Sequence, residues 1–206
     1  MAETAQELYE RVTATSDDAW RAQALQTLTS WGTFPFDTGG LQIAALEPPE
    51  AEPPRTGEGG RPCGACERVA SEELDDAEVW RGERWRLIAL PPSGAPLVLM
   101  LQPLAHHDLT DLPDDLAAEL GVLQVHLARA VEALPNIARC HVLRFGDGGA
   151  HLHVFFFARV ADVPQLRGSF LLVWDDLLPP TPQEQVRADA VAVARALVAS
   201  YGGRAR

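Results

Sequence analysis

The sequence is poor in basic residues. It has 17 lysine and arginine residues against 29 aspartate and glutamate residues, which gives a formal net charge of −12. Broad binding to a nucleic-acid backbone needs a basic surface, so the composition argues against that class of function. It does not argue against a phosphorylated small molecule, which needs positive charge only at its own site.

The sequence also lacks a long apolar stretch. A membrane-spanning helix needs about 18 or more consecutive apolar residues, and none is present, so no membrane partner is expected. The first residues, MAETAQELYERV, are polar and acidic, unlike a signal peptide. These features predict a cytoplasmic protein.

Cysteine is scarce, with three residues: Cys63, Cys66 and Cys140. A small, odd number is typical of a reducing compartment, where disulfides are rare. In that setting a C-x-x-C pair binds metal or does redox chemistry more often than it forms a structural disulfide. Cys140 is a lone cysteine in a predicted strand and is expected in the core.

What is present is enough for one sizeable domain and an appendage, with 206 residues of which 47% are hydrophobic. Residues 1–46 are predicted to be an N-terminal helical extension, with two helices over 4–31, the second capped by Ser16, and a short strand over 41–46. Residues 47–62, EPPEAEPPRTGEGGRP, are predicted to be a linker that does not hold one conformation. Residues 63–206 are predicted to form the main domain.

Within the main domain the patterns predict strands separated by helices. Strands are expected at 78–81, 85–90, 97–102, 139–145, 151–160 and 170–174. A long helix begins at Pro113, where Leu116, Leu120, Leu123, Leu127, Val131 and Leu134 form one apolar stripe. Thr181 opens a capping-box pattern before a final helix. The order predicts an α+β fold with a mainly antiparallel sheet.

The most informative stretch is HLHVFFFAR, residues 151–159. Side chains alternate along a strand, so His151, His153, Phe155 and Phe157 are predicted to share one face. Two imidazoles on one face can serve a metal, a phosphate or a nucleophile. The alternative is that both are satisfied core histidines.

Four side chains have the chemistry of zinc ligands: Cys63, Cys66, His106 and His151. Zinc takes cysteine and histidine in a tetrahedral shell, and C-x-x-C brings two thiolates to one ion. Two alternatives remain open from spacing alone, a C-x-x-C that occurs by chance in a loop and a dithiol redox pair.

The order of these features resembles the histidine-triad (HIT) superfamily. C-x-x-C is followed by a strand ending in Pro-x-x-His (103–106), by Asp-Leu-x-x-Asp-Leu before a long helix, and by a glycine-rich turn with HLHV and Arg159. The superfamily includes nucleoside phosphoramidate and dinucleoside polyphosphate hydrolases and the galactose-1-phosphate uridylyltransferase branch. The resemblance covers residues 63–160.

The resemblance implies a role for each matching residue. His153 matches the triad nucleophile, which attacks an α-phosphorus and forms a nucleotidyl-histidine. The amides of Gly148 and Gly149 would hold phosphate oxygens. Cys63, Cys66, His106 and His151 match the zinc ligands of zinc-bearing branches, where the ion is structural. The implied partner is a phosphorylated small molecule, in particular a nucleotide, and many members of the family are homodimers.

The chain departs from the family at the third triad position, which is Phe155. Phenylalanine neither donates to a phosphate oxygen nor protonates a leaving group. Polar residues usual before the triad are replaced by Gly148, Gly149 and Ala150, and Arg144 occupies the place of a frequent asparagine.

Further candidates for binding the substrate come from the remaining basic side chains near the triad. Arg144 and Arg159 are candidates for phosphate contacts, His141 for a place in the pocket, and His107 as a spare histidine.

Three functions follow from these observations. The favoured one is a zinc-containing HIT-type hydrolase or nucleotidyltransferase acting on a phosphoanhydride, phosphoramidate or sugar-nucleotide bond. The alternative is a catalytically degenerate HIT-like zinc protein that binds a nucleotide or a protein partner, with Phe155 and Phe157 filling the old pocket. A C-x-x-C redox protein is the third.

Overall fold

A single antiparallel sheet organises the described chain. The computed structural model describes residues 5–15, 17–30, 34–36, 40–41, 48–71 and 76–206. The six strands lie in the order β4-β5-β3-β2-β1-β6. Their bounds are β1 Glu78–Arg81, β2 Trp85–Ala89, β3 Val98–Pro103, β4 Ile137–Leu143, β5 Val154–Val160 and β6 Arg204–Ala205. The predicted α+β fold with an antiparallel sheet is confirmed.

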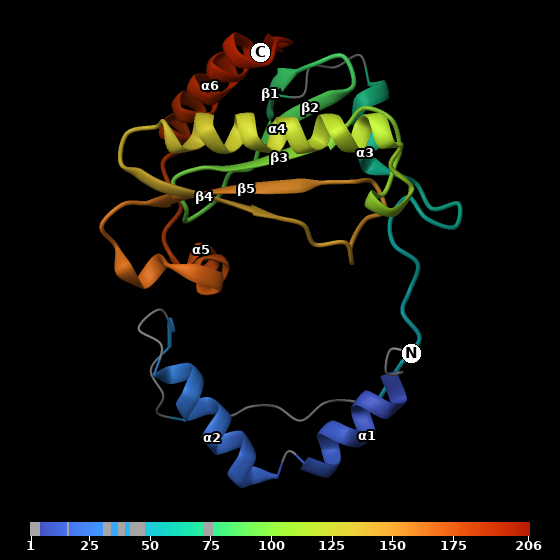
Figure 1. Ribbon diagram of the computed structural model, residues 1–206, viewed down its shortest axis with the longest axis vertical. Coiled ribbons are helices and arrows are strands. Elements are labelled where there is room, and N and C mark those ends of the chain that lie inside the picture. The colour runs from blue at the N-terminus through green and yellow to red at the C-terminus, as the bar shows by residue number, and fades with distance from the viewer. Residues whose placement is uncertain (1–4, 16, 31–33, 37–39, 42–47, 72–75) are drawn as a thin grey trace.

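Two helices cover one face of the sheet (Figure 1). They are α4, Asp114–Glu132, and α6, Gln183–Ser200. The predicted stripe of α4 is buried, and Leu123 and Leu127 in its middle are fully enclosed with Phe156 of β5. Burying a leucine side chain stabilises the fold by about 1.5–3 kcal/mol, so this face forms the main core.

The opposite face carries a second, smaller core under α5, Leu171–Leu177. Residues 170–174 are helical and do not form the predicted strand: Phe170 ends a 3-10 turn, and α5 begins at Leu171. Leu171, Trp174 and Leu178 follow a helical spacing and pack beside Phe157. The Asp175 carboxylate accepts hydrogen bonds from the Ser93 hydroxyl at 2.6 Å and the Ala95 amide at 2.7 Å. These contacts favour the helix because a strand would turn Trp174 and Asp175 to opposite faces.

The C-terminal end of the chain closes the β1 edge of the sheet. Helix α6 begins after Pro182 without a side-chain cap. Thr181 instead donates its hydroxyl to the Ala95 carbonyl at 2.9 Å, so the predicted capping box is wrong. Gly202 has a φ of 112°, which a glycine adopts without strain, and the chain then pairs along β1 as β6.

The N-terminal part contains the two predicted helices, α1 Ala5–Thr15 and α2 Asp18–Thr29, which lie on the α5 side of the sheet (Figure 1). The cap of α2 is Asp17, whose side chain accepts from the Trp20 amide at 2.8 Å. The expected cap, Ser16, lies outside the described residues, as does nearly all of the strand expected over 41–46. Phe34 packs edge-on against Phe170 with ring centroids 5.4 Å apart.

The remaining elements are short. They are α3 Gly64–Ala70 and the 3-10 turns η1 Leu109–Asp111, η2 Pro164–Leu166 and η3 Gly168–Phe170. None of the helices in the described residues combines the length and apolar character that crossing a membrane requires. The division of the chain after residues 46 and 62 stays a prediction.

Candidate metal centre and adjoining cavity

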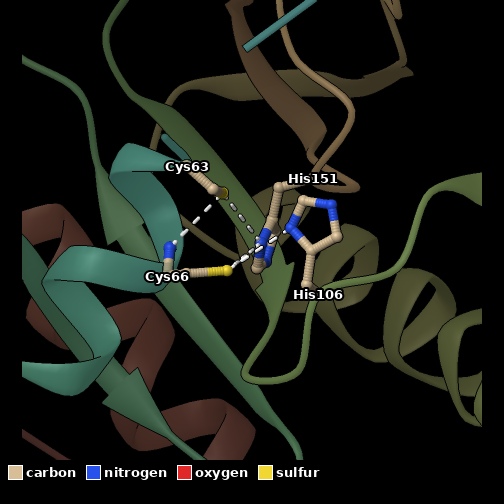
Figure 2. A group of neighbouring side chains, drawn as sticks. All are labelled: Cys63, Cys66, His106 and His151. Carbon is tan, nitrogen blue, oxygen red and sulfur yellow. Dashed lines mark hydrogen bonds between the residues drawn. The ribbon is translucent and has the colours of Figure 1, made fainter. Parts of the chain in front are cut away.

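Four side chains from three separate segments meet beside the start of β5. Cys63 precedes α3 and Cys66 lies in its first turn, His106 follows β3, and His151 precedes β5 (Figure 2). Their ligand atoms all lie within 4.8 Å of one another. The structure therefore brings together the four residues that the sequence singles out.

The spacing of the sulfur and nitrogen atoms fits a tetrahedral ion. His151 Nδ1 lies 3.6 Å from Cys63 Sγ and 3.5 Å from Cys66 Sγ, and His106 Nδ1 lies 3.4 Å from Cys66 Sγ. With Zn–S bonds of about 2.3 Å and Zn–N bonds of about 2.1 Å, tetrahedral angles separate sulfur from nitrogen by about 3.6 Å. Two thiols and two imidazoles are also the donors that zinc prefers.

The orientation of His151 leaves one ring nitrogen free for a metal. Its Nε2 lies 2.9 Å from the Pro103 carbonyl oxygen. A carbonyl oxygen only accepts, so Nε2 carries the proton and the Nδ1 lone pair faces the cysteines. Burial lowers the pKa of His151, which keeps the ring neutral. Burial and the Cys63 thiol raise the pKa of Cys66 to about 11.

A loop from the end of the predicted linker closes over this cluster. Thr56 donates its amide to the Gly148 carbonyl at 3.2 Å, and Ala150 donates its amide to the Thr56 carbonyl at 2.9 Å. A Cβ on Gly57 would lie 2.8 Å from His106 Cε1, and Gly57 has a φ of 82°. Only glycine combines this backbone with so close an approach. The last residues of the predicted linker thus hold a defined place against the main body.

The predicted nucleophile, His153, stands beside the cluster. Its Nδ1 lies 2.8 Å from the His151 carbonyl oxygen, so Nδ1 carries the proton and Nε2 keeps its lone pair in the neutral ring. Phe155 packs edge-on to it, with ring centroids 5.4 Å apart. Strand β5 begins at Val154, so His151 and His153 precede the strand that was predicted to contain them.

His153 lines a cavity of about 380 Å³. This volume lies within the range of small-molecule sites, at its lower end. The other lining residues come from the loop, from α3, from β3 and from the triad segment: Thr56, Cys63, Gly64, Ala65, Arg68, Met100, Gln102, Gly149, His151 and Phe155. The cavity thus joins the candidate nucleophile to the candidate metal cluster.

The other predicted binding residues lie around or away from this cavity. Gly149 lines it, while the Gly148 carbonyl accepts the Thr56 hydroxyl at 2.9 Å. Arg144 pairs with Asp108. Burial alone would raise the pKa of Asp108, but the Leu109 amide and the Arg55 and Arg144 guanidinium groups outweigh it and lower that pKa.

Arg159 and His141 lie farther along the sheet. Arg159 is six residues beyond His153, which is about 20 Å along an extended chain. His141 lies opposite Phe157 on β4, and burial followed by the charge of Arg159 lowers its pKa. Neither residue lines the cavity. His107 faces Asp111, with Nδ1 3.9 Å from the carboxylate.

Sequence reasoning missed several lining residues, among them the side chains of Arg68, Met100 and Gln102. Arg68 lies one helical turn after Gly64, the first residue of α3, so both positions are on the same face of that helix. This four-residue spacing is the sequence signal that could have identified Arg68. Gln102 is the last residue of the predicted strand, just before Pro103. Only its two-residue spacing from Met100 indicates that the two side chains lie on the same face of the sheet.

Comparisons with known proteins bear on the fold. A protein described as a hypothetical histidine triad nucleotide-binding protein from Sulfolobus tokodaii superposes with a TM-score of 0.51 at 18% identity, covering 68% of this chain and 97% of that one. A zinc-bound histidine triad family protein from Mycobacterium smegmatis gives 0.49 at 20%, covering 67% and 97%. A uridylyltransferase gives 0.43 at 21%, covering 67% of this chain and 46% of that one.

The first of these likenesses confirms that the chain has the fold of histidine triad proteins. No protein-family model matches the sequence, and no curated protein matches it. A shared fold does not determine function, so the function of the site depends on its own residues.

Proposed function

We propose that the protein is a HIT-type nucleotidyl hydrolase or transferase in which His153 is the nucleophile. The bond attacked is a phosphoanhydride, phosphoramidate or sugar-nucleotide bond. His153 Nε2 bonds to the α-phosphorus, the leaving group departs with the electron pair of its own bond, and water or another acceptor then takes the nucleotidyl group.

The observation that carries the proposal is the tautomer of His153. A histidine nucleophile needs an unprotonated nitrogen directed at its substrate. The Nδ1–H group donates to the His151 carbonyl at 2.8 Å, which leaves Nε2 as the nucleophilic atom. The same contact fixes the ring, and the side chain borders a cavity of about 380 Å³. A fixed ring reduces the entropy lost on reaching the transition state.

Zinc is proposed as the resident ion of the Cys63, Cys66, His106 and His151 cluster. Bound there, it would stabilise the two thiolates and act as a structural ion that ties α3 to the segments after β3 and before β5. The reaction itself is assigned to the chain's own residues and not to the ion. The His151 carbonyl oxygen accepts a hydrogen bond from His153 Nδ1, so the segment that supplies a ligand to the cluster also positions the nucleophile.

A nucleotide is the proposed ligand. The Sulfolobus protein that shares this fold is described as nucleotide-binding, and we carry that property to this chain as part of the proposal. The cavity supports it through its mixed lining, with Met100 and Phe155 as apolar surfaces and Gln102 and Arg68 as hydrogen-bond donors. Apolar walls with a few polar groups are typical of small-molecule sites.

The test is turnover of a panel containing a dinucleoside polyphosphate, an adenosine phosphoramidate and a sugar nucleotide. Wild type and His153→Ala are compared, with His126→Gln as the control, since His126 lies on α4 and its ring packs against Tyr201, away from the cavity. We expect turnover and an alkali-stable nucleotidyl adduct on wild type and on the control, and neither on His153→Ala.

A folded, zinc-loaded wild type that consumes no member of the panel and forms no adduct would contradict the proposal. The protein would then be assigned to the alternative, a HIT-like zinc protein that binds a nucleotide or a protein partner. Phe155, which packs against His153, would be the first residue to examine in that case.

A further inference from the structure

Arg68 is a cation at the cavity that the fold leaves available. In the described part of the chain its guanidinium has no hydrogen bond or ion pair, and its side chain is exposed while it lines the cavity. By contrast, Arg55 lies 2.8 Å from the Asp108 carboxylate, and Arg144 pairs with the same carboxylate. Among these three arginines, only Arg68 has no carboxylate partner within the residues that the structure describes, so its charge can serve a ligand.

Gln102 presents a second donor to the same cavity. Its Oε1 accepts from Arg86 Nη2 at 2.8 Å, and because a guanidinium only donates, this contact fixes which end of the amide is oxygen. Among the residues that the structure describes, the amide nitrogen then contacts only the Met100 thioether sulfur at 3.8 Å, a weak acceptor. Gln102 is 4% exposed, so its N–H group is a buried donor without a strong acceptor.

Both donors keep their protons during a reaction. A guanidinium does not release its proton in a protein, and an amide does not titrate. They can stabilise negative charge that develops on an oxygen, as oxyanion-binding groups do. Phe155, packed against the nucleophile, adds no proton donor beside them. Arg68 and Gln102 therefore suit a leaving group that departs as an anion, without being protonated.

From this set of donors we infer that Arg68 and Gln102 form the leaving-group subsite, and that the substrate is a phosphoric anhydride whose leaving group is itself a phosphate. This inference rests on the proposed function at His153 and narrows its substrate class. An amine leaving group does not fit, because an amine departs from phosphorus only after its own nitrogen has been protonated.

The step balances with the groups named. The His153 Nε2 lone pair forms a bond to the α-phosphorus, and the bond between that phosphorus and the bridging oxygen breaks. The electron pair stays on that oxygen, which leaves as a phosphate or pyrophosphate anion held by Arg68 and Gln102. Water then attacks the phosphorus, the phosphorus–nitrogen bond returns its electron pair to Nε2, and the proton lost by the water goes to solvent.

The first experiment compares two substrates with the same nucleoside, a 5′-phosphoric anhydride and a 5′-phosphoramidate of a basic amine. The zinc-loaded full chain is used as wild type, Arg68→Gln and the charge-matched control Arg195→Gln, an exposed arginine on α6. We expect wild type and control to prefer the anhydride by at least about 100-fold, and Arg68→Gln to lose at least about tenfold in kcat for it. Equal turnover of the two substrates by wild type would overturn the inference.

The second experiment measures the binding of inorganic pyrophosphate by calorimetry to the same three proteins. Binding that weakens at least about tenfold in Arg68→Gln alone is expected, because an ion pair is removed from the subsite. Equal binding to all three proteins, or no binding to wild type, would overturn the inference. Arg68-dependent binding together with no turnover of any substrate would retain the anion subsite and refute the proposed function, so the two failures are distinct.

Discussion

Asp108 Oδ2 lies 2.8 Å from Arg55 Nη1, which joins the loop after β3 to the segment before α3. Arg144, at the end of β4, pairs with the other oxygen of the same carboxylate. Arg55 Nη1 also donates to the Gly146 carbonyl at 2.9 Å. One buried carboxylate therefore holds together the loop after β3, the segment before α3 and the turn after β4, and the last two of these contribute Thr56 and Gly149 to the cavity.

Replacing Asp108 by asparagine should loosen these segments. We expect Asp108→Asn to lower the free energy of unfolding by about 1–3 kcal/mol, because charged hydrogen bonds are lost from a buried group. Hydrogen exchange of the Ala150 amide, which donates to the Thr56 carbonyl at 2.9 Å, should become faster. Asp147→Asn, an exposed acid in the adjoining turn, is the control. Equal exchange rates in the two variants would contradict this role.

Metal content should follow the Cys63, Cys66, His106 and His151 cluster. We expect about one zinc per chain by elemental analysis, with little retained in Cys63→Ser or His106→Ala, because removing one donor breaks the four-ligand shell. A strong chelator should also lower the midpoint of thermal unfolding, since a bound ion stabilises the folded state. Cys140→Ser is the control, because this thiol packs beside the main core outside the cluster. Full zinc in Cys63→Ser would refute the assignment.

Two neighbouring residues of α4 should differ sharply in their effect on stability. Leu123 is fully buried and Val122 is 48% exposed. We expect Leu123→Ala to cost about 2–5 kcal/mol in the free energy of unfolding, because it leaves a cavity in the core. Val122→Ala should stay within about 0.5 kcal/mol. Urea denaturation measures both, and similar values would mean that α4 does not pack as described.

The pair formed by Arg84 and Glu119 should make stability depend on acid pH. The Arg84 guanidinium, hydrogen-bonded to the carboxylate, lowers the pKa of Glu119, and Trp85 Nε1 donates to it at 2.8 Å. A carboxyl with a lowered pKa stabilises the fold above its unfolded pKa, near 4.3, and loses this contribution as the pH falls through its folded pKa.

Glu119→Gln should therefore destabilise the protein at pH 7 by about 1 kcal/mol, a modest value because the pair is partly exposed to solvent. The difference from wild type should shrink as the pH falls below about 4. Urea unfolding at a series of pH values measures it. A difference that stays constant down to pH 2 would show that the charge of Glu119 is not what stabilises the fold.

The sheet was predictable because the alternation of side chains between the two faces of its strands is visible in the sequence. Leu99 and Leu101 alternate with Met100 and Gln102, and the two leucines are the fully buried ones. Residues 170–174 show no such alternation, and a short apolar run fits a strand or a buried helical turn equally well. The helix is favoured by tertiary contacts, namely the Asp175 carboxylate on Ser93 and Ala95, which no local pattern encodes.

The candidate site also combines residues that the sequence identifies with residues that only the structure identifies. Cys63 and Cys66 stand out because the chemistry of the pair is visible in its spacing, and the two histidines complete a known donor set. Arg68 and Gln102 did not stand out, since a single arginine or glutamine is common on any surface. What marks them is the absence of a strong acceptor within the described chain, which only coordinates reveal.

The cluster of Cys63, Cys66, His106 and His151 lies across the pairing of two strands. His106 follows β3 and His151 precedes β5, and these strands pair in a register that sets Leu101 opposite Val154. A slip of one residue would turn every side chain of β5 to the other face and carry His151 away from the cysteines. The four side chains meet only when β3 and β5 pair in the correct register. An ion bound by all four would therefore stabilise that register relative to a shifted one.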